Sequence, residues 1–96
     1  MSIYLGDRLT LEATFKDKDD ALYDPDDIKI HIYDPKNGED AVIEMGDITK
    51  ISVGVYQAEY DIPQDKMAGT WRSIWEATTA NGVKREQLTF SVNSIF

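Results

Sequence analysis

The stretch that decides the fold is GVYQAEYDIPQDKMAGTWRSIWEA, residues 54–77. Apolar and polar side chains alternate strictly on both sides of Ile62-Pro63, which interrupts the run. Successive side chains of a β-strand point to opposite faces, so the alternation predicts two antiparallel strands that face one core. The residues on the predicted inward faces are Tyr56, Ala58, Tyr60, Ile62, Trp71, Ser73, Trp75 and Ala77.

Further strands are predicted on either side of this stretch. Residues 9–15 and 28–32 alternate in the same way, and the three isoleucines of the second segment suit the centre of a sheet. In the last strand, Leu88, Phe90 and Val92 are predicted to point inward. Shorter strands are expected at residues 3–5, 41–45 and 48–51.

Turn residues separate these segments. Asn81-Gly82 is the strongest hairpin signal, and the turn at residues 34–38 offers Gly38 for a positive φ. Residues 16–27 predict a polar loop in which residues 21–23 touch the core. A single helical turn is expected at residues 63–67, where Pro63 suits a first helical position.

These signals predict an all-β fold, an antiparallel β-sandwich of about seven strands. The 96 residues are enough for one domain, which we assign to residues 1–96, and 42% hydrophobic residues favour a folded core over disorder.

Composition excludes several functions. The chain has no cysteine, so disulfides, thiolate metal sites and a cysteine nucleophile are excluded. The net charge of −8 repels phosphate backbones and argues against nucleic-acid binding. We find no signal peptide, and no apolar run long enough to span a membrane.

Catalytic chemistry finds little support. His31 is the only histidine, and it alternates with isoleucines on an outward face, which favours a surface histidine. No Gly-x-Ser-x-Gly motif is present, and paired carboxylates need a cleft that a sandwich of this size rarely has. We therefore predict a non-enzymatic protein without a cofactor.

The loop after residue 16 is rich in aspartate, and calcium prefers such oxygen ligands. Asp17, Asp19 and Asp20 are weak metal candidates. The segment lacks the glycine and the closing glutamate of a calcium loop, so a turn-rich loop whose aspartates cap backbone amides is favoured.

Outward-facing apolar residues indicate contact surfaces instead. The tryptophans and the inward tyrosines are predicted to be core rather than a sugar-stacking platform. Ile74 lies between Arg72 and Glu76 on a polar face. The candidate interaction residues are Tyr4, Tyr33, Ile74, Ile95 and Phe96.

The order of these motifs resembles the small immunoglobulin-like modules encoded among the head and tail genes of tailed bacteriophages and prophages. The resemblance spans nearly the whole chain. It rests on residues 6–15, Asp24-Pro25, residues 28–35, residues 46–49, residues 54–56, residues 60–63 and residues 69–77.

The resemblance implies an immunoglobulin-like fold and no catalytic residue. It implies a structural or interaction protein of a phage or prophage particle, found in the virion or in the host cytoplasm before assembly. Its partners would be other protein subunits or copies of itself. The alternative is a carbohydrate-binding or adhesion module of a bacterial cell-surface protein, which predicts exposed aromatic rings.

Overall fold

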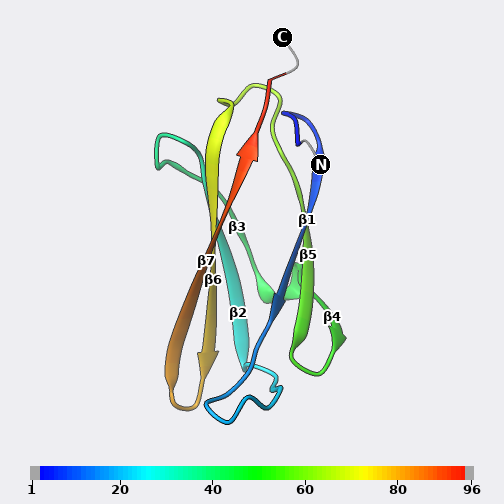
Figure 1. The fold of residues 1–96 in the computed structure, drawn as a ribbon, viewed down its shortest axis with the longest axis vertical. Coiled ribbons are helices and arrows are strands. Elements are labelled where there is room, and N and C mark those ends of the chain that lie inside the picture. Colours follow the sequence, from blue (N-terminus) through cyan, green and yellow to red (C-terminus); the bar gives the residue numbers. More distant parts are fainter. Residues whose placement is uncertain (1–2, 95–96) are drawn as a thin grey trace.

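The computed structural model describes residues 3–94 and shows an immunoglobulin-like β-sandwich of seven strands (Figure 1). The all-β prediction is thus confirmed. The strands are β1 (Arg8–Thr14), β2 (Asp27–Tyr33), β3 (Glu39–Ile43), β4 (Thr49–Ser52), β5 (Val55–Asp61), β6 (Gly69–Thr79) and β7 (Gly82–Val92). A short 3-10 helix, η1 (Met45–Asp47), connects β3 to β4.

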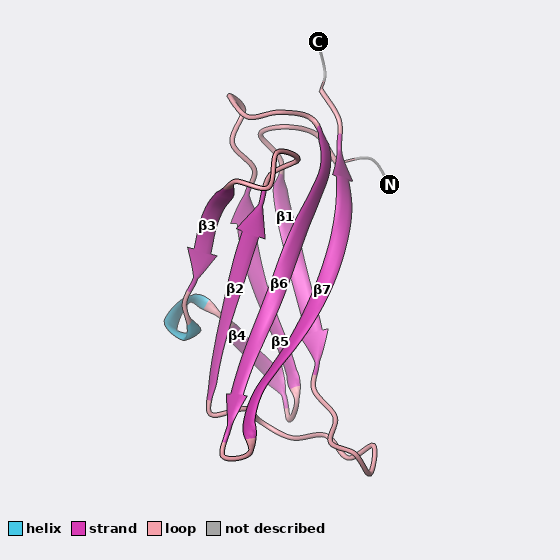
Figure 2. Ribbon diagram, turned by 90° about the vertical axis from the view of Figure 1, so that its left-hand side faces the viewer, coloured by secondary structure: helices cyan, strands magenta, loops and turns pink. Residues whose placement is uncertain are grey.

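The strands form two antiparallel sheets, which Figure 2 shows one behind the other. One sheet has the order β1-β5-β4 and the other the order β3-β2-β6-β7. The stretch at residues 54–77 supplies β5 to the first sheet and β6 to the second. Its two alternating runs therefore face each other across the core rather than pairing side by side.

The core lies between these sheets and follows the predicted alternation. The isoleucines of β2 and the two tryptophans of β6 have no exposed surface, and β2 is central as expected, with β3 and β6 on either side. Phe15 fills the space between the layers: its ring lies 5.8 Å from Tyr56 and 6.3 Å from Trp75. Phe15 meets Tyr56 edge to face and is tilted against Trp75, and aromatic pairs prefer such arrangements to a face-to-face sandwich.

Both predicted hairpins form, but in each the turn is positioned one residue earlier than the sequence predicts. Ala80 and Asn81 make the two-residue connection between β6 and β7, and Gly82 has a φ of 124°. In the β2–β3 turn it is Asn37, not Gly38, that takes the positive φ, at 65°. The Asp34 carboxylate accepts hydrogen bonds from the amides of Lys36 and Gly38 at 2.9 Å, which holds the chain in this conformation.

Three local expectations need correction. Residues 63–67 form a turn without a helix, and the helical turn occurs at Met45–Asp47 instead. The strand expected at residues 3–5 is reduced to a single parallel bridge between Tyr4 and Asn93. Of residues 21–23, only Tyr23 packs against the core, whereas Leu22 is exposed.

Leu88 is the main departure within a strand. Alternation places it on the inner face of β7 with Phe90 and Val92, yet its side chain is 41% exposed. The reason is that β7 and β1 end their sheets on the same side of the sandwich. A hollow separates their inner faces at the level of Leu88, so nothing covers this side chain fully.

Candidate interaction surface

The outer face of the four-stranded sheet brings two of the predicted interaction residues together. Strand registers place Val42, His31 and Ile74 in one row across β3, β2 and β6. Tyr33 and Arg72 form the next row on the same face. We call these five side chains the outer patch. Tyr33 and Ile74 therefore belong to one surface although they are far apart in the sequence.

The rings and the guanidinium of the outer patch are stacked. Arg72 Cζ lies 5.0 Å from the centre of the Tyr33 ring, a cation–π distance. The His31 ring is nearly parallel to that of Tyr33, with centres 6.5 Å apart. His31 Nδ1 lies 3.4 Å from Glu39 Oε2, and Arg72 Nε is buried without a hydrogen-bond partner among the described residues.

Burial raises the pKa of the Tyr33 hydroxyl above its ordinary value, and the Glu39 carboxylate beside it acts in the same direction. A tyrosine hydroxyl is already protonated at neutral pH at its ordinary pKa, so Tyr33 can donate a hydrogen bond there, and the raised pKa extends this to more alkaline solution. A patch with aliphatic, aromatic and donor groups matches the composition of the centre of protein interfaces, where aromatic residues and arginine are enriched.

Charged pairs border the outer patch. Lys29 Nζ lies 3.9 Å from Glu44 Oε2, and Arg85 Nε lies 3.0 Å from Glu76 Oε2. Exposed ion pairs of this kind contribute little to stability, typically below about 1 kcal/mol. Lys29, Glu76 and Arg85 are register partners across β2, β6 and β7, so these charges form one row along one side of the outer patch.

Tyr4, a third predicted contact residue, lies elsewhere. Tyr4 forms a bridge with Asn93, beside the end of β7. Tyr4 is therefore separated from the outer-patch residues of β2, because β6 lies between β7 and β2 in the sheet. It is thus not part of the outer patch. Ile95 and Phe96 fall outside the described residues.

Two of the weak metal candidates, Asp17 and Asp20, make side-chain contacts within their own loop. Asp17 Oδ1 accepts hydrogen bonds from the amides of Asp19 at 2.8 Å and Ala21 at 3.0 Å. Asp20 Oδ1 lies 3.6 Å from Lys16 Nζ. Within residues 3–94, no three or more His, Asp or Glu side chains are grouped so that they could hold a metal ion.

Sequence reasoning missed Val42, His31 and Arg72 as members of the outer patch. All three occupy outward positions of an alternating strand, but only the pairing of β3, β2 and β6 gathers them with Tyr33 and Ile74. That pairing joins residues that are distant in the chain, so alternation within one strand cannot reveal it.

The comparisons with known proteins give no family: no protein-family model matches this chain, and no curated protein matches its sequence. Within the described part of the chain, no helix has the length and apolarity that a membrane span requires.

Proposed function

We propose that this chain is a non-enzymatic structural or interaction protein that acts through protein–protein contacts. The outer patch is the observation that supports this: two aliphatic side chains, two rings and an arginine adjoin on one sheet face, with a row of charged side chains beside them. A phage or prophage particle, as a head–tail or tail component, is the setting that the sequence resemblance supports.

In such a particle the partners are other subunits, including further copies of this chain. A modest contact repeated by symmetry gains avidity, so a patch of this size is sufficient there. The proposal places the protein in the virion, and in the host cytoplasm before assembly.

The alternative, a carbohydrate-binding or adhesion module, predicts a surface of exposed aromatic rings, and the described residues do not form one. A sugar-stacking platform needs exposed rings, whereas Trp71 and Trp75 have no exposed surface. Among the described aromatic residues, Tyr4 alone is exposed.

Light scattering over a concentration series tests the proposal with copies of the chain as the partner. We expect concentration-dependent association of the wild type, which Ile74→Asp abolishes because a carboxylate would be buried at the contact. Val83→Asp is the matched control: Val83 is exposed on the same face of the sheet, near the start of β7 and beside the hairpin turn. A wild type that stays monomeric at millimolar concentration, or an Ile74→Asp variant that still associates, would contradict self-assembly through the outer patch.

A further inference from the structure

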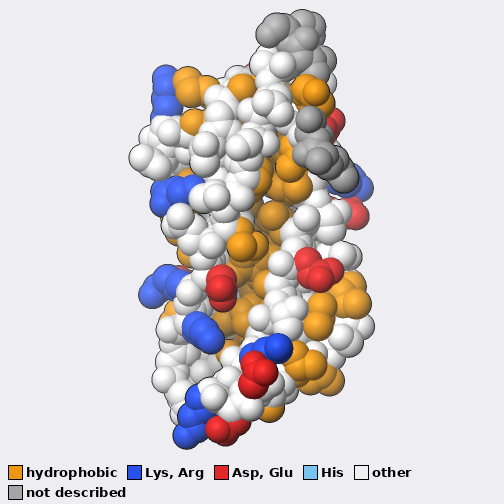
Figure 3. Space-filling view, viewed as in Figure 1, with side chains coloured by type: hydrophobic (Ala, Val, Ile, Leu, Met, Phe, Trp, Pro, Cys, Tyr) orange, Lys and Arg blue, Asp and Glu red, His pale blue; other side chains and the backbone are white. Residues whose placement is uncertain are grey.

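The open side of the sandwich carries a second surface, separate from the outer patch. β1 and β7 face each other there as the edge strands of the two sheets. Between them lies a hollow of about 170 Å³, whose lining includes Ala13, Phe15, Trp75 and Leu88. Figure 3 shows hydrophobic side chains running down the middle of this face.

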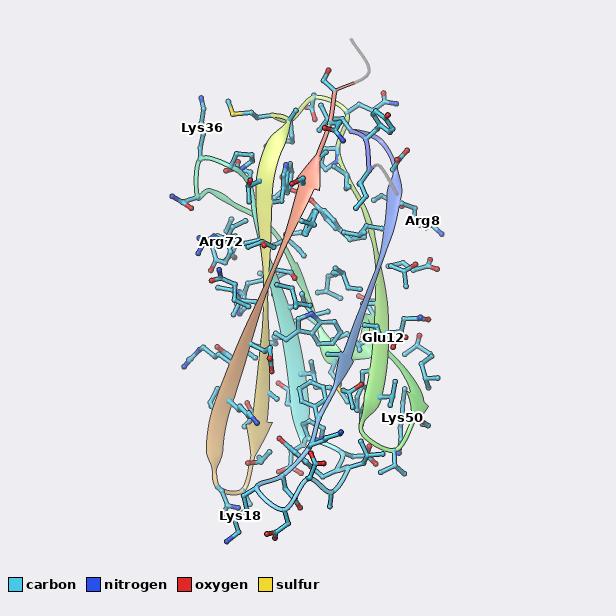
Figure 4. All side chains as sticks on the ribbon, viewed as in Figure 1. Arg8, Glu12, Lys18, Lys36, Lys50 and Arg72 are labelled. Atoms are coloured by element: carbon cyan, nitrogen blue, oxygen red, sulfur yellow. The ribbon has the colours of Figure 1, made fainter. Side chains whose placement is uncertain are left out.

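Towards the β6–β7 hairpin, a larger hollow of about 500 Å³ has a different character. Lys16, Lys18 and Lys84 line it together with Tyr23, Thr79, Asn81 and Asp17. Figure 4 shows Lys18 at this end of the molecule, and Figure 3 shows basic side chains on the β7 side of the face. We call the two hollows together the edge groove.

Basic residues gathered in this way are unusual in a chain with a net charge of −8. Among the ion pairs of residues 3–94, none involves Lys18 or Lys84. Asp17, the acidic residue of this hollow, already accepts two backbone hydrogen bonds. The lysine end of the edge groove is therefore suited to a carboxylate.

The chain already shows how this edge accepts a segment. Beside the end of β7, the amide of Leu5 donates to the carbonyl of Asn93 at 3.0 Å, and the amide of Asn93 donates to the carbonyl of Ile3 at 2.8 Å. Beyond this contact, β6 is the one strand that pairs with β7 in the described structure. An edge of this kind is a template for adding an extended peptide through main-chain hydrogen bonds.

We propose that the edge groove binds an extended segment of a partner protein, which lengthens the four-stranded sheet beside β7. An apolar side chain of the segment packs between Phe15 and Leu88, and a carboxylate lies against Lys18 and Lys84. Glu12 and Glu86 line the apolar hollow, so they exclude a second carboxylate there. Charge complementarity thus favours an acidic end on an otherwise apolar and neutral segment, rather than a second copy of this acidic chain.

The test uses two capped peptides that differ at one end only, Asp-Val-Thr-Val-Thr-Gln and Lys-Val-Thr-Val-Thr-Gln, titrated into the full chain and followed by amide NMR. We expect the acidic peptide to shift and protect amides of β7 and Phe15. Loss of one close charge contact commonly changes affinity about tenfold, so the lysine peptide should bind at least about fivefold more weakly.

Variants locate the binding. Leu88→Asp should abolish it, and Lys84→Glu should remove the preference for the acidic peptide, because it leaves two lysines and two acidic residues in the larger hollow. Gln87→Glu is the matched control, because Gln87 is exposed on the same strand but faces the opposite side, beside Ile74. Each variant is first checked for a folded amide spectrum.

Several results would overturn the proposal: equal affinity for the two peptides, shifts confined to the outer face, or no shift at millimolar peptide. A dimer of the wild type that Leu88→Asp dissociates would assign the edge groove to a second copy instead. Ile74→Asp should leave peptide binding unchanged, so failure here and failure of the outer-patch proposal are distinguishable.

Discussion

The hydroxyl of Tyr56 donates a hydrogen bond to Asp24 Oδ1 at 3.1 Å, which joins the loop before β2 to β5. The same carboxylate accepts hydrogen bonds from the Gly54 amide at 2.9 Å and from Lys50 Nζ at 2.6 Å. One aspartate therefore holds β4, the β4–β5 turn and β5 against a long loop. It also satisfies a hydroxyl on a buried ring.

We predict that Asp24 makes stability depend on pH in the acid range. The hydrogen bond from Lys50, followed by that from the Gly54 amide, holds the pKa of Asp24 below its ordinary value. A lowered pKa in the folded state stabilises the fold above the ordinary aspartate pKa, and this stabilisation is lost as pH falls through the folded value. Urea unfolding at a series of pH values should therefore show a shallower acid decline for Asp24→Asn than for the wild type. Parallel curves would contradict this role.

Gly54→Ala should destabilise the fold by about 1–3 kcal/mol, because the new side chain is strained in both conformation and space. Gly54 has a φ of +75°, and a Cβ there would lie 2.9 Å from the carbonyl oxygen of Phe15. Denaturant unfolding measures the change. Gly46→Ala is the control, since a Cβ at Gly46 meets nothing within 4 Å, and equal losses for the two variants would refute the argument.

Tyr60→Phe tests a hydrogen bond that joins the two sheets. The Tyr60 hydroxyl donates to Asp40 Oδ2, and Lys66 Nζ lies 3.6 Å from Asp40 Oδ1. The Asp40 side chain is only 7% exposed, so losing the hydroxyl leaves a poorly solvated carboxylate with one partner fewer. We expect a loss of about 1–3 kcal/mol in the free energy of unfolding. Tyr4→Phe, at an exposed ring, should change it by less than about 0.5 kcal/mol.

The same substitution, isoleucine to alanine, at a buried and at an exposed position tests how much core packing contributes to stability. Ile30→Ala should cost about 2–5 kcal/mol, because Ile30 is fully buried and a cavity would form beside Trp75. Ile51→Ala removes the same atoms from a side chain that is 53% exposed, and should change stability by less than about 0.5 kcal/mol. Thermal and urea unfolding of both variants measure the difference, and similar losses would show that Ile30 is not packed as described.

Alternation predicted the centre of the core. It assigned Trp71, Trp75 and the isoleucines of β2 to inward faces, and all are fully buried. It could not predict that Leu88 stays exposed, because a side chain on an inner face is buried only where the opposite sheet extends over it. The extent of the opposite sheet is a property of the whole fold, not of β7.

The interaction surfaces were predicted only in part. Tyr33 and Ile74 were recognised singly, but their union with Val42 and Arg72 depends on the pairing of β2 with β3 and β6. The edge groove was not foreseen at all, since its lysines come from the loop after β1 and from β7. Their proximity arises from tertiary structure alone.

The pairing of β1 with β5 has a consequence for the order of folding. Arg8 and its partner Asp61 are 53 positions apart in the chain, whereas Thr79 and Gly82 pair across a two-residue turn. Closing the longer loop costs more chain entropy, so we expect the β6–β7 hairpin to form early and β1 to dock late. Leu11→Ala should then accelerate unfolding more than it slows refolding. Until β1 docks, the tryptophan-bearing face of β6 lacks part of its cover, so we expect the folding chain to be prone to misassembly in this interval.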